Sequence, residues 1–453
     1  MEKTLDFSKV KKNGIINLSF QIIPVLLALY SIPKLLSFYG EELWGFYTLF
    51  ITFLMLFNHI NFGIAPSTAK LISEFIGQNR HGKIGVVVFN SFIWNIIIIS
   101  FSSVIYFVTQ KYLVDYFGAT NFNVTQCLNY VLLCGAILLF NSCFRAFFEA
   151  MQMYVLVSII RSLLSAVIFL APLLLSFTSH HEIEDMLLFI LFTYMTSFLV
   201  YIVSFYLTCN GSFFKYDSLI FTRLYSWGKW LGLHSLLSPF LLYLDRFLIK
   251  SFLSVNVVAL YTIPFDLSAR MSLISGSYTS SFYTAVSRWN KQKHINISIY
   301  YFKTLQTILI IISIISILGM LLSEFFLNLW ISQEFSINNY KILQILIFAN
   351  FFNAINITSL RFLQGVGELK YPITIQLLLI PIYIFMLISF VHYDVWGVAL
   401  SFLIRMVIES TILTSKVIMF LKARHTIYKS DYKELIKILC IVFIVSSLLL
   451  IFT

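Results

Sequence analysis

The sequence predicts an all-α integral membrane protein, with about twelve transmembrane helices arranged in two pseudo-symmetric six-helix bundles. Composition is the first observation: 59% of the 453 residues are hydrophobic, 11% are charged, and the mean hydropathy is +0.88. Soluble domains carry about 25% charged residues, so this composition excludes a soluble fold. The second observation is a series of apolar segments of about 20 residues, the length at which an α-helix crosses a bilayer. The third is a repeat that relates the first half of the chain to the second.

Twelve apolar segments follow one another along the chain, separated by short polar connections. They are predicted at residues 15–33, 43–62, 84–108, 124–147, 153–177, 186–208, 228–249, 257–285, 297–322, 339–362, 371–391 and 396–421. The first follows a basic stretch, as in a signal peptide. It contains Asn17, Gln21 and Pro24, and no small-residue cleavage site follows it, so we expect an uncleaved helix. A thirteenth apolar run at residues 435–452 follows a basic linker, and either a transmembrane or an interfacial helix fits it.

Two stretches of the chain echo each other. Ser37–Leu49 aligns with Ser251–Ile263, with identical Ser-Phe and Tyr-Thr pairs, and a weaker echo relates Arg145–Tyr154 to Arg361–Tyr371. Each echo falls at equivalent helix junctions, which predicts two homologous halves. Transporters built from such repeats bind their substrates near the bilayer midplane between the repeats. The predicted parts are one bundle at residues 1–215, a second bundle at 216–421, and a basic linker with an apolar helix at 422–453.

Lys and Arg are distributed unequally between the two sides of the predicted membrane, and cytoplasmic connections are the side that is enriched in them. If the N-terminus is cytoplasmic, most of the 31 Lys and Arg residues lie in cytoplasmic connections. Five fall on the outside: Lys34, Lys111, Arg246, Lys250 and Lys341. We therefore predict a cytoplasmic N-terminus. The same pattern accounts for the net charge of +11 without nucleic acid as a partner.

Five charged residues inside apolar segments are the candidates for chemistry: Arg161, Asp266, Arg270, Arg405 and Glu409. A charge at the bilayer centre costs about 2.5–3.5 kcal/mol on insertion scales, which makes each a functional candidate. Arginines outnumber carboxylates, and a guanidinium donates two parallel hydrogen bonds to phosphate. We predict that all five contribute to substrate binding in a hydrated cavity, with the two carboxylates orienting the arginines. The alternative is that Asp266–Arg270 and Arg405–Glu409, each four residues apart on a helix, neutralise each other and only hold the fold.

Two histidines in apolar segments, His59 and His234, are candidates for coupling transport to protons. The alternative for both is a packing or hydrogen-bonding role. The five cysteines show no spacing typical of a metal site or a disulfide framework. No cofactor and no metal ion is therefore predicted.

With twelve helices in two halves, the chain resembles the Wzx-type O-antigen and polysaccharide flippases of the multidrug/oligosaccharidyl-lipid/polysaccharide exporter superfamily. The stretches that carry the resemblance are LDRFLIKSFLSVNVVALYTI, FYGEELWGFYTL, NFGIAPSTAKLISEF, FRAFFEAMQMY and FLQGVGELKYP. They cover both halves, essentially residues 1–421, and they indicate the superfamily more specifically than the substrate. Family members often carry Asp before the Phe-Gly pair of the second helix, where this chain has Asn61, so no role is predicted there.

The resemblance implies a transporter, not an enzyme, that moves an O-antigen or capsule repeat unit on undecaprenyl diphosphate to the outer leaflet of the bacterial inner membrane. It implies alternating access driven by an ion gradient. Its partners would be the lipid-linked oligosaccharide, membrane lipids and other polysaccharide-assembly proteins. Two alternatives stay open. A multidrug exporter of the same superfamily would favour an acidic cavity for cationic drugs, and a membrane polysaccharide polymerase or ligase would carry a large outer loop.

Overall fold

The computed structural model is helical throughout the elements it describes, which confirms the predicted all-α class. The described residues are 7–59, 63–118, 122–178, 182–209, 215–289, 297–368, 370–423 and 437. The helices of the first part are α1 (Phe7–His59), α2 (Ile64–Gly77), η1 (His81–Lys83), α3 (Ile84–Phe117), α4 (Val124–Ala150), α5 (Tyr154–Leu175), α6 (Ile183–Thr208) and α7 (Ser218–Phe252). Those of the second part are α8 (Val255–Ala269), α9 (Met271–Trp289), α10 (Ile297–Leu321), α11 (Ser323–Trp330), α12 (Gln333–Val366), α13 (Lys370–Phe390), η2 (Val391–Tyr393) and α14 (Asp394–Ala423).

Each predicted segment coincides with described helix. The first two lie in α1, whose helical geometry is broken at Gly40 (φ 74°, ψ 172°), a conformation that glycine adopts because it has no Cβ. Within the described residues, nine helical stretches are long and apolar enough to cross a membrane. This number is below twelve because α1 counts once, α13 and α14 count together, and α7 is not among the nine. The predicted run at 435–452 lies outside the described residues.

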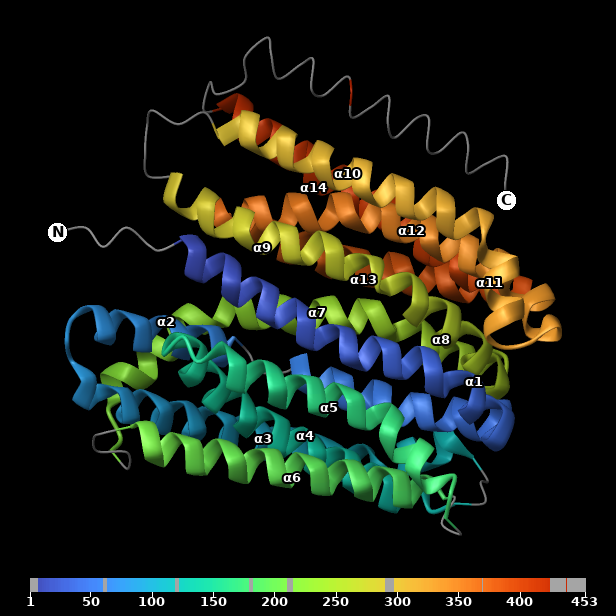
Figure 1. The fold of residues 1–453 in the computed structure, drawn as a ribbon, viewed down its shortest axis with the longest axis horizontal. Helices are drawn as coiled ribbons and strands as arrows, with labels where there is room; N and C mark the ends of the chain where they lie inside the picture. The colour runs from blue at the N-terminus through green and yellow to red at the C-terminus, as the bar shows by residue number, and fades with distance from the viewer. Residues whose placement is uncertain are drawn as a thin grey trace. The chain divides into compact units, whose positions relative to one another are not determined.

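The chain divides into two compact units, residues 1–240 and 241–453, and the division falls inside α7. In unit 1, α4 packs against α1, α2, α3 and α6, while α5 packs against α1 and α6 (Figure 1). Aromatic contacts of Phe144 and Phe147 with Phe205 join α4 to α6. These contacts position four helices around the site described below. The boundary predicted from the repeat, at residues 215 and 216, stays a prediction.

In unit 2, α12 is the central helix. It packs against α8, α9, α10, α11 and α14, and 83% of its most apolar stretch is buried. Polar residues in its middle, such as Gln344 and Asn350, are buried in protein, as the bilayer requires of polar groups at membrane depth. The amide of Asn350 donates to the Ser268 hydroxyl (3.1 Å), and that of Gln344 donates to the Ser323 hydroxyl (3.1 Å).

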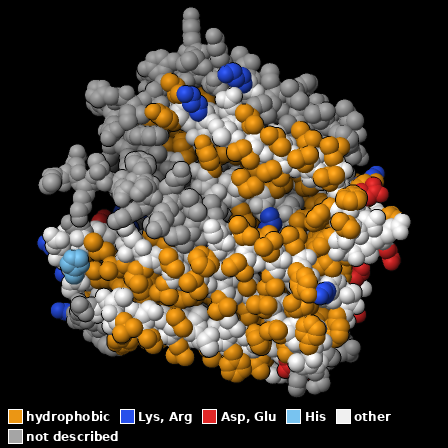
Figure 2. All heavy atoms as spheres, in the orientation of Figure 1, with side chains coloured by type: hydrophobic (Ala, Val, Ile, Leu, Met, Phe, Trp, Pro, Cys, Tyr) orange, Lys and Arg blue, Asp and Glu red, His pale blue; other side chains and the backbone are white. Residues whose placement is uncertain are grey.

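Large hydrophobic side chains are exposed along several helices. On α3 the exposed group includes Phe101, Val104, Phe107 and Val108, and on α13 it includes Phe385. Figure 2 shows hydrophobic side chains over much of the visible face. Exposed apolar area of this extent destabilises a protein in water but suits contact with lipid tails.

Gly397, near the start of α14, should tolerate no side chain. A Cβ at this position would lie 1.7 Å from the carbonyl oxygen of Phe390, which is backbone and cannot move aside cheaply. We expect Gly397→Ala to destabilise unit 2 on the order of 1–3 kcal/mol, the usual cost of overpacking. Thermal unfolding in detergent measures this. The matched control is Gly276→Ala in α9, where a Cβ meets nothing within 4 Å. An unchanged melting temperature for Gly397→Ala would contradict the close approach of Gly397 to the Phe390 carbonyl.

Candidate functional site

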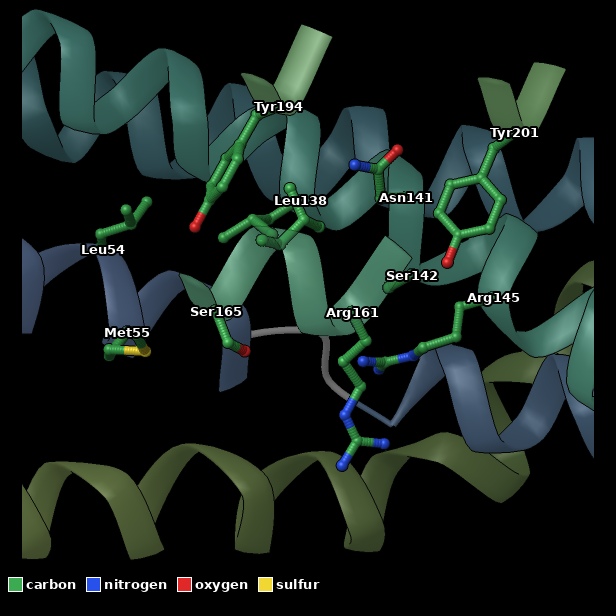
Figure 3. Close-up of a pocket in the computed structure, with 11 residues that line it drawn as sticks. Leu54, Met55, Leu138, Asn141, Ser142, Arg145, Arg161, Ser165, Tyr194 and Tyr201 are labelled. Carbon is green, nitrogen blue, oxygen red and sulfur yellow. The ribbon is translucent and has the colours of Figure 1, made fainter. Parts of the chain in front are cut away.

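A pocket opens in unit 1 between four helices (Figure 3). The space between its side chains amounts to about 690 Å³, including the open mouth. The part that a water-sized group can occupy is about 140 Å³, smaller than the roughly 300–1,000 Å³ of sites that enclose a drug-sized ligand. Its lining comes from α1 (Leu54, Met55), α4 (Leu138, Asn141, Ser142, Arg145), α5 (Arg161, Leu164, Ser165) and α6 (Tyr194, Tyr201).

Two arginines give the pocket its charge. Arg145 lies near the end of α4 and Arg161 lies two turns into α5, so the short connection between these helices brings them to one place. Figure 3 shows the Arg145 guanidinium beside the Arg161 side chain. Arg145 Nε lies 3.9 Å from Glu149 Oε1. Arg161 was predicted as a site residue, whereas Arg145 was assigned to a cytoplasmic connection.

Neutral polar groups complete the lining. Asn141 is 4% exposed, and its Nδ2 donates to the Ser197 hydroxyl at 2.9 Å. Its Oδ1 is buried and has no hydrogen-bond partner among the described residues. Tyr194 and Tyr201, seven residues apart on α6, present their rings from the same face of that helix. The sequence signal for this group is spacing: Asn141 and Arg145 are four residues apart, so they share a helix face.

In unit 2, charged residues of α7 and α8 form a buried network. Arg246 donates to Asp266 Oδ1 at 2.6 Å, and its Cζ lies 5.0 Å from the centre of the Tyr243 ring. The Asp266 side chain is 42% exposed, whereas the side chain of Arg246 is almost fully buried. Asp245 is fully buried, and its Oδ2 accepts from the Tyr261 hydroxyl at 2.5 Å. Neither Asp245 nor Arg246 was predicted as a site residue, and Arg246 was assigned to an outside connection.

The alternative that Asp266 pairs with Arg270 within the helix is not the ion pair that the described residues show, because Asp266 pairs with Arg246. Arg270 lies where α8 ends and α9 begins, one turn after Asp266, and its side chain is half-buried. The backbone there is tighter than an α-helix: Arg270 N–H donates to the Leu267 carbonyl at 3.3 Å. Arg270 keeps helical dihedrals (φ −61°, ψ −24°), so the junction is one tightened turn and not an unwound segment.

Arg405 and Glu409 lie deep in α14. Arg405 is 2% exposed, donates to the Leu241 carbonyl, and has its Cζ 4.5 Å from the centre of the Tyr383 ring. Glu409 is also buried and accepts from Gln376 Nε2 at 3.4 Å. The predicted neutralisation of Arg405 by Glu409 within the helix is thus not the contact that either group makes in the described chain. Aromatic rings and a backbone carbonyl compensate the arginine instead.

The two predicted coupling histidines are placed differently. His59 is the last residue of α1, and its side chain lies outside what is described. His234 is half-buried in α7. The described residues contain no group of three His, Cys, Asp or Glu side chains that could hold a metal ion. Burial also raises the pKa of Cys209, just beyond α6, which keeps this thiol protonated and disfavours it as a ligand.

Comparison with known proteins shows the family to which the chain belongs. The sequence profile of the family described as "Polysaccharide biosynthesis protein" matches residues 10–288. The chain is also similar to a protein of Shigella flexneri that is provisionally assigned as an O-antigen transporter. The two are 24% identical over 408 residues, which cover 89% of this chain and 96% of that protein.

Solved structures show the same fold in transporters. An inward-facing multidrug resistance MATE family transporter of the MOP superfamily superposes with a TM-score of 0.65 at 16% identity, covering 91% of this chain and 99% of that chain. An outward-facing one has a TM-score of 0.66 at 16% identity, covering 92% and 95%. A variant of a MATE transporter of Vibrio cholerae has a TM-score of 0.66 at 16% identity, covering 92% and 98%. The fold is therefore that of MATE-like transporters.

Proposed function

Because the chain belongs to the polysaccharide biosynthesis protein family, we propose that it is a flippase for oligosaccharides linked to undecaprenyl diphosphate, acting by alternating access. The diphosphate and sugars of such a substrate cannot cross hydrocarbon unaided. Moving an isolated charge into a low-dielectric medium costs on the order of tens of kcal/mol in the Born limit. A flippase must supply polar and cationic groups in place of that water.

The observation that carries the proposal is a pocket with two arginines inside an apolar helical unit. Guanidinium groups match the geometry of phosphate oxygens and stay charged at any physiological pH. The Shigella flexneri relative, assigned to O-antigen transport, supports the same substrate class.

The orientation and compartment belong to the proposal. Lys and Arg are enriched in the connections that a cytoplasmic N-terminus would place in the cytoplasm, which favours a multi-pass protein of the bacterial inner membrane in that orientation. The connection between α4 and α5 is then cytoplasmic. The pocket, which holds Arg145 and Arg161 near that connection, lies toward the side on which the substrate is made.

Unit 2 holds the other proposed binding residues. Asp266 and Arg270, near the junction of α8 and α9, are its accessible members, since both are partly exposed. Arg405 and Glu409 are buried, contact Tyr383 and Gln376 of α13, and stay proposed site residues of unit 2. His234 and His59 stay the proposed proton-coupling residues.

The test is complementation of a bacterial strain that lacks its own O-antigen flippase. We expect the chain to restore surface polysaccharide, detected by gel staining and antibody, while an empty vector restores none. Protein in the membrane without any surface polysaccharide, across strains with different repeat units, would overturn the proposed function.

A second candidate is favoured by the fold alone: a multidrug exporter, since the structural neighbours are MATE transporters. Cationic drugs need acidic cavities, and the unit 1 pocket is lined by arginines. A panel of cationic drugs separates the two candidates. Raised drug resistance in cells that lack exporters, without restored polysaccharide, would favour the exporter.

A further inference from the structure

The unit 1 pocket carries an uncompensated positive charge. α5 contains no Asp or Glu over its whole length, and α4 contains Glu149 alone. Glu149 is 3.9 Å from Arg145, and both side chains are partly exposed, so this pair is weak. Within the described part of unit 1, Arg161 takes part in no ion pair. The acidic residues of α6 are in its first turn, at the opposite end from the two arginines.

An isolated guanidinium in an apolar segment is costly unless an anion or water joins it. Arg145 is within reach of a ligand, because its side chain is 29% exposed. The wall beside it holds the buried, unpartnered Oδ1 of Asn141, an acceptor that needs a hydroxyl or amide donor. Two cations and one open acceptor in the same pocket favour a ligand that carries both negative charge and hydroxyl groups.

We propose that this pocket binds the diphosphate of the lipid-linked substrate, with Arg145 and Arg161 as the binding residues. The inference rests on the proposed function and deepens it by naming the group that the pocket takes. The sugar next to the diphosphate donates a hydroxyl to Asn141 Oδ1. Glu149 opposes binding, because its carboxylate lies on the same arginine that the phosphate approaches.

The test measures binding in nanodiscs of phosphatidylcholine, with the full chain and two probes. Inorganic pyrophosphate reports the anion site itself, and undecaprenyl diphosphate reports the lipid-borne form. We expect Arg145→Ala and Arg161→Ala each to weaken binding about tenfold or more, since each removes charge-assisted hydrogen bonds. We expect Glu149→Gln to strengthen it. Arg223→Ala is the matched control, because Arg223 is an exposed arginine of the same unit.

Each outcome decides the proposal. If the two arginine variants lose binding of both probes, the result supports a diphosphate site. If they lose binding of undecaprenyl diphosphate alone, the result supports a site that also needs the lipid. No binding by the unaltered chain would overturn the proposal. Binding by both arginine variants as tight as that of the unaltered chain would also overturn it. Weaker binding in Glu149→Gln would also count against it, because a purely structural ion pair predicts that sign.

Surface polysaccharide separates this proposal from the proposed function. If the unaltered chain restores polysaccharide and the arginine variants do so equally well without binding diphosphate, the pocket lies off the transport route and the flippase assignment stands. If the unaltered chain binds diphosphate but restores no polysaccharide, the site stands and the function fails.

Discussion

Replacing Arg405 with alanine is expected to remove most of the folded protein from the membrane, whereas Arg270→Ala should leave the protein level unchanged and abolish surface polysaccharide. Arg405 is 2% exposed and donates to the Leu241 carbonyl of α7, between the rings of Tyr383 and Phe402. Truncation removes this hydrogen bond and leaves a cavity beside the two rings. Together these cost about 3–5 kcal/mol.

Arg270 differs in its surroundings. It is half-buried at the junction of α8 and α9, where its loss opens no closed core. Size-exclusion profiles of a fluorescent fusion measure folded protein, and gel staining measures polysaccharide. Normal folding with lost polysaccharide in Arg405→Ala would place Arg405 in the substrate site instead, and unfolding of Arg270→Ala would make Arg270 structural.

Much of the fold was predictable because a bilayer imposes a length and a composition on every spanning helix. Twelve apolar runs therefore coincide with described helices. The interruption at Arg270 was not predictable, since residues 257–285 read as one uniform apolar segment. Only the backbone bonds around Arg270 divide it into α8 and α9.

The site was predictable where a charge stands alone in an apolar run. Arg161 is such a residue, and it lines the pocket. Arg145 was not predicted as a site residue because it lies close to a polar connection. Arg246 was not predicted because it lies close to the predicted end of its segment. Arg246 lies three residues before the predicted end of its segment at residue 249, whereas α7 continues to Phe252. It is buried there and pairs with Asp266 of α8.

Asp266 and Arg246 should depend on each other for the stability of unit 2. Removing one partner of a fully buried pair costs about 3–5 kcal/mol, because the remaining charge is buried and uncompensated. The Asp266 side chain is 42% exposed, so solvent screening reduces the expected cost of Asp266→Ala to roughly 2 kcal/mol. Arg246→Met leaves the Asp266 carboxylate able to reach solvent, but it also removes the cation next to the fully buried Asp245, so we expect a similar cost.

The double variant Arg246→Met with Asp266→Ala decides whether the ion pair or the packing holds α7 against α8. The double variant removes both charges of the pair and leaves the buried Asp245 carboxylate with its hydrogen bond from Tyr261, so its loss of stability should be smaller than the sum of the two single losses. Thermal unfolding of the three variants in one detergent gives the coupling energy. If the stability losses of the two single variants add up to that of the double variant, the 2.6 Å contact between Arg246 and Asp266 contributes nothing to stability by itself. A different result is a double variant that is more stable than Asp266→Ala and still fails to export polysaccharide. That result would show that Asp266, which Arg246 holds near the junction of α8 and α9, serves transport and not folding.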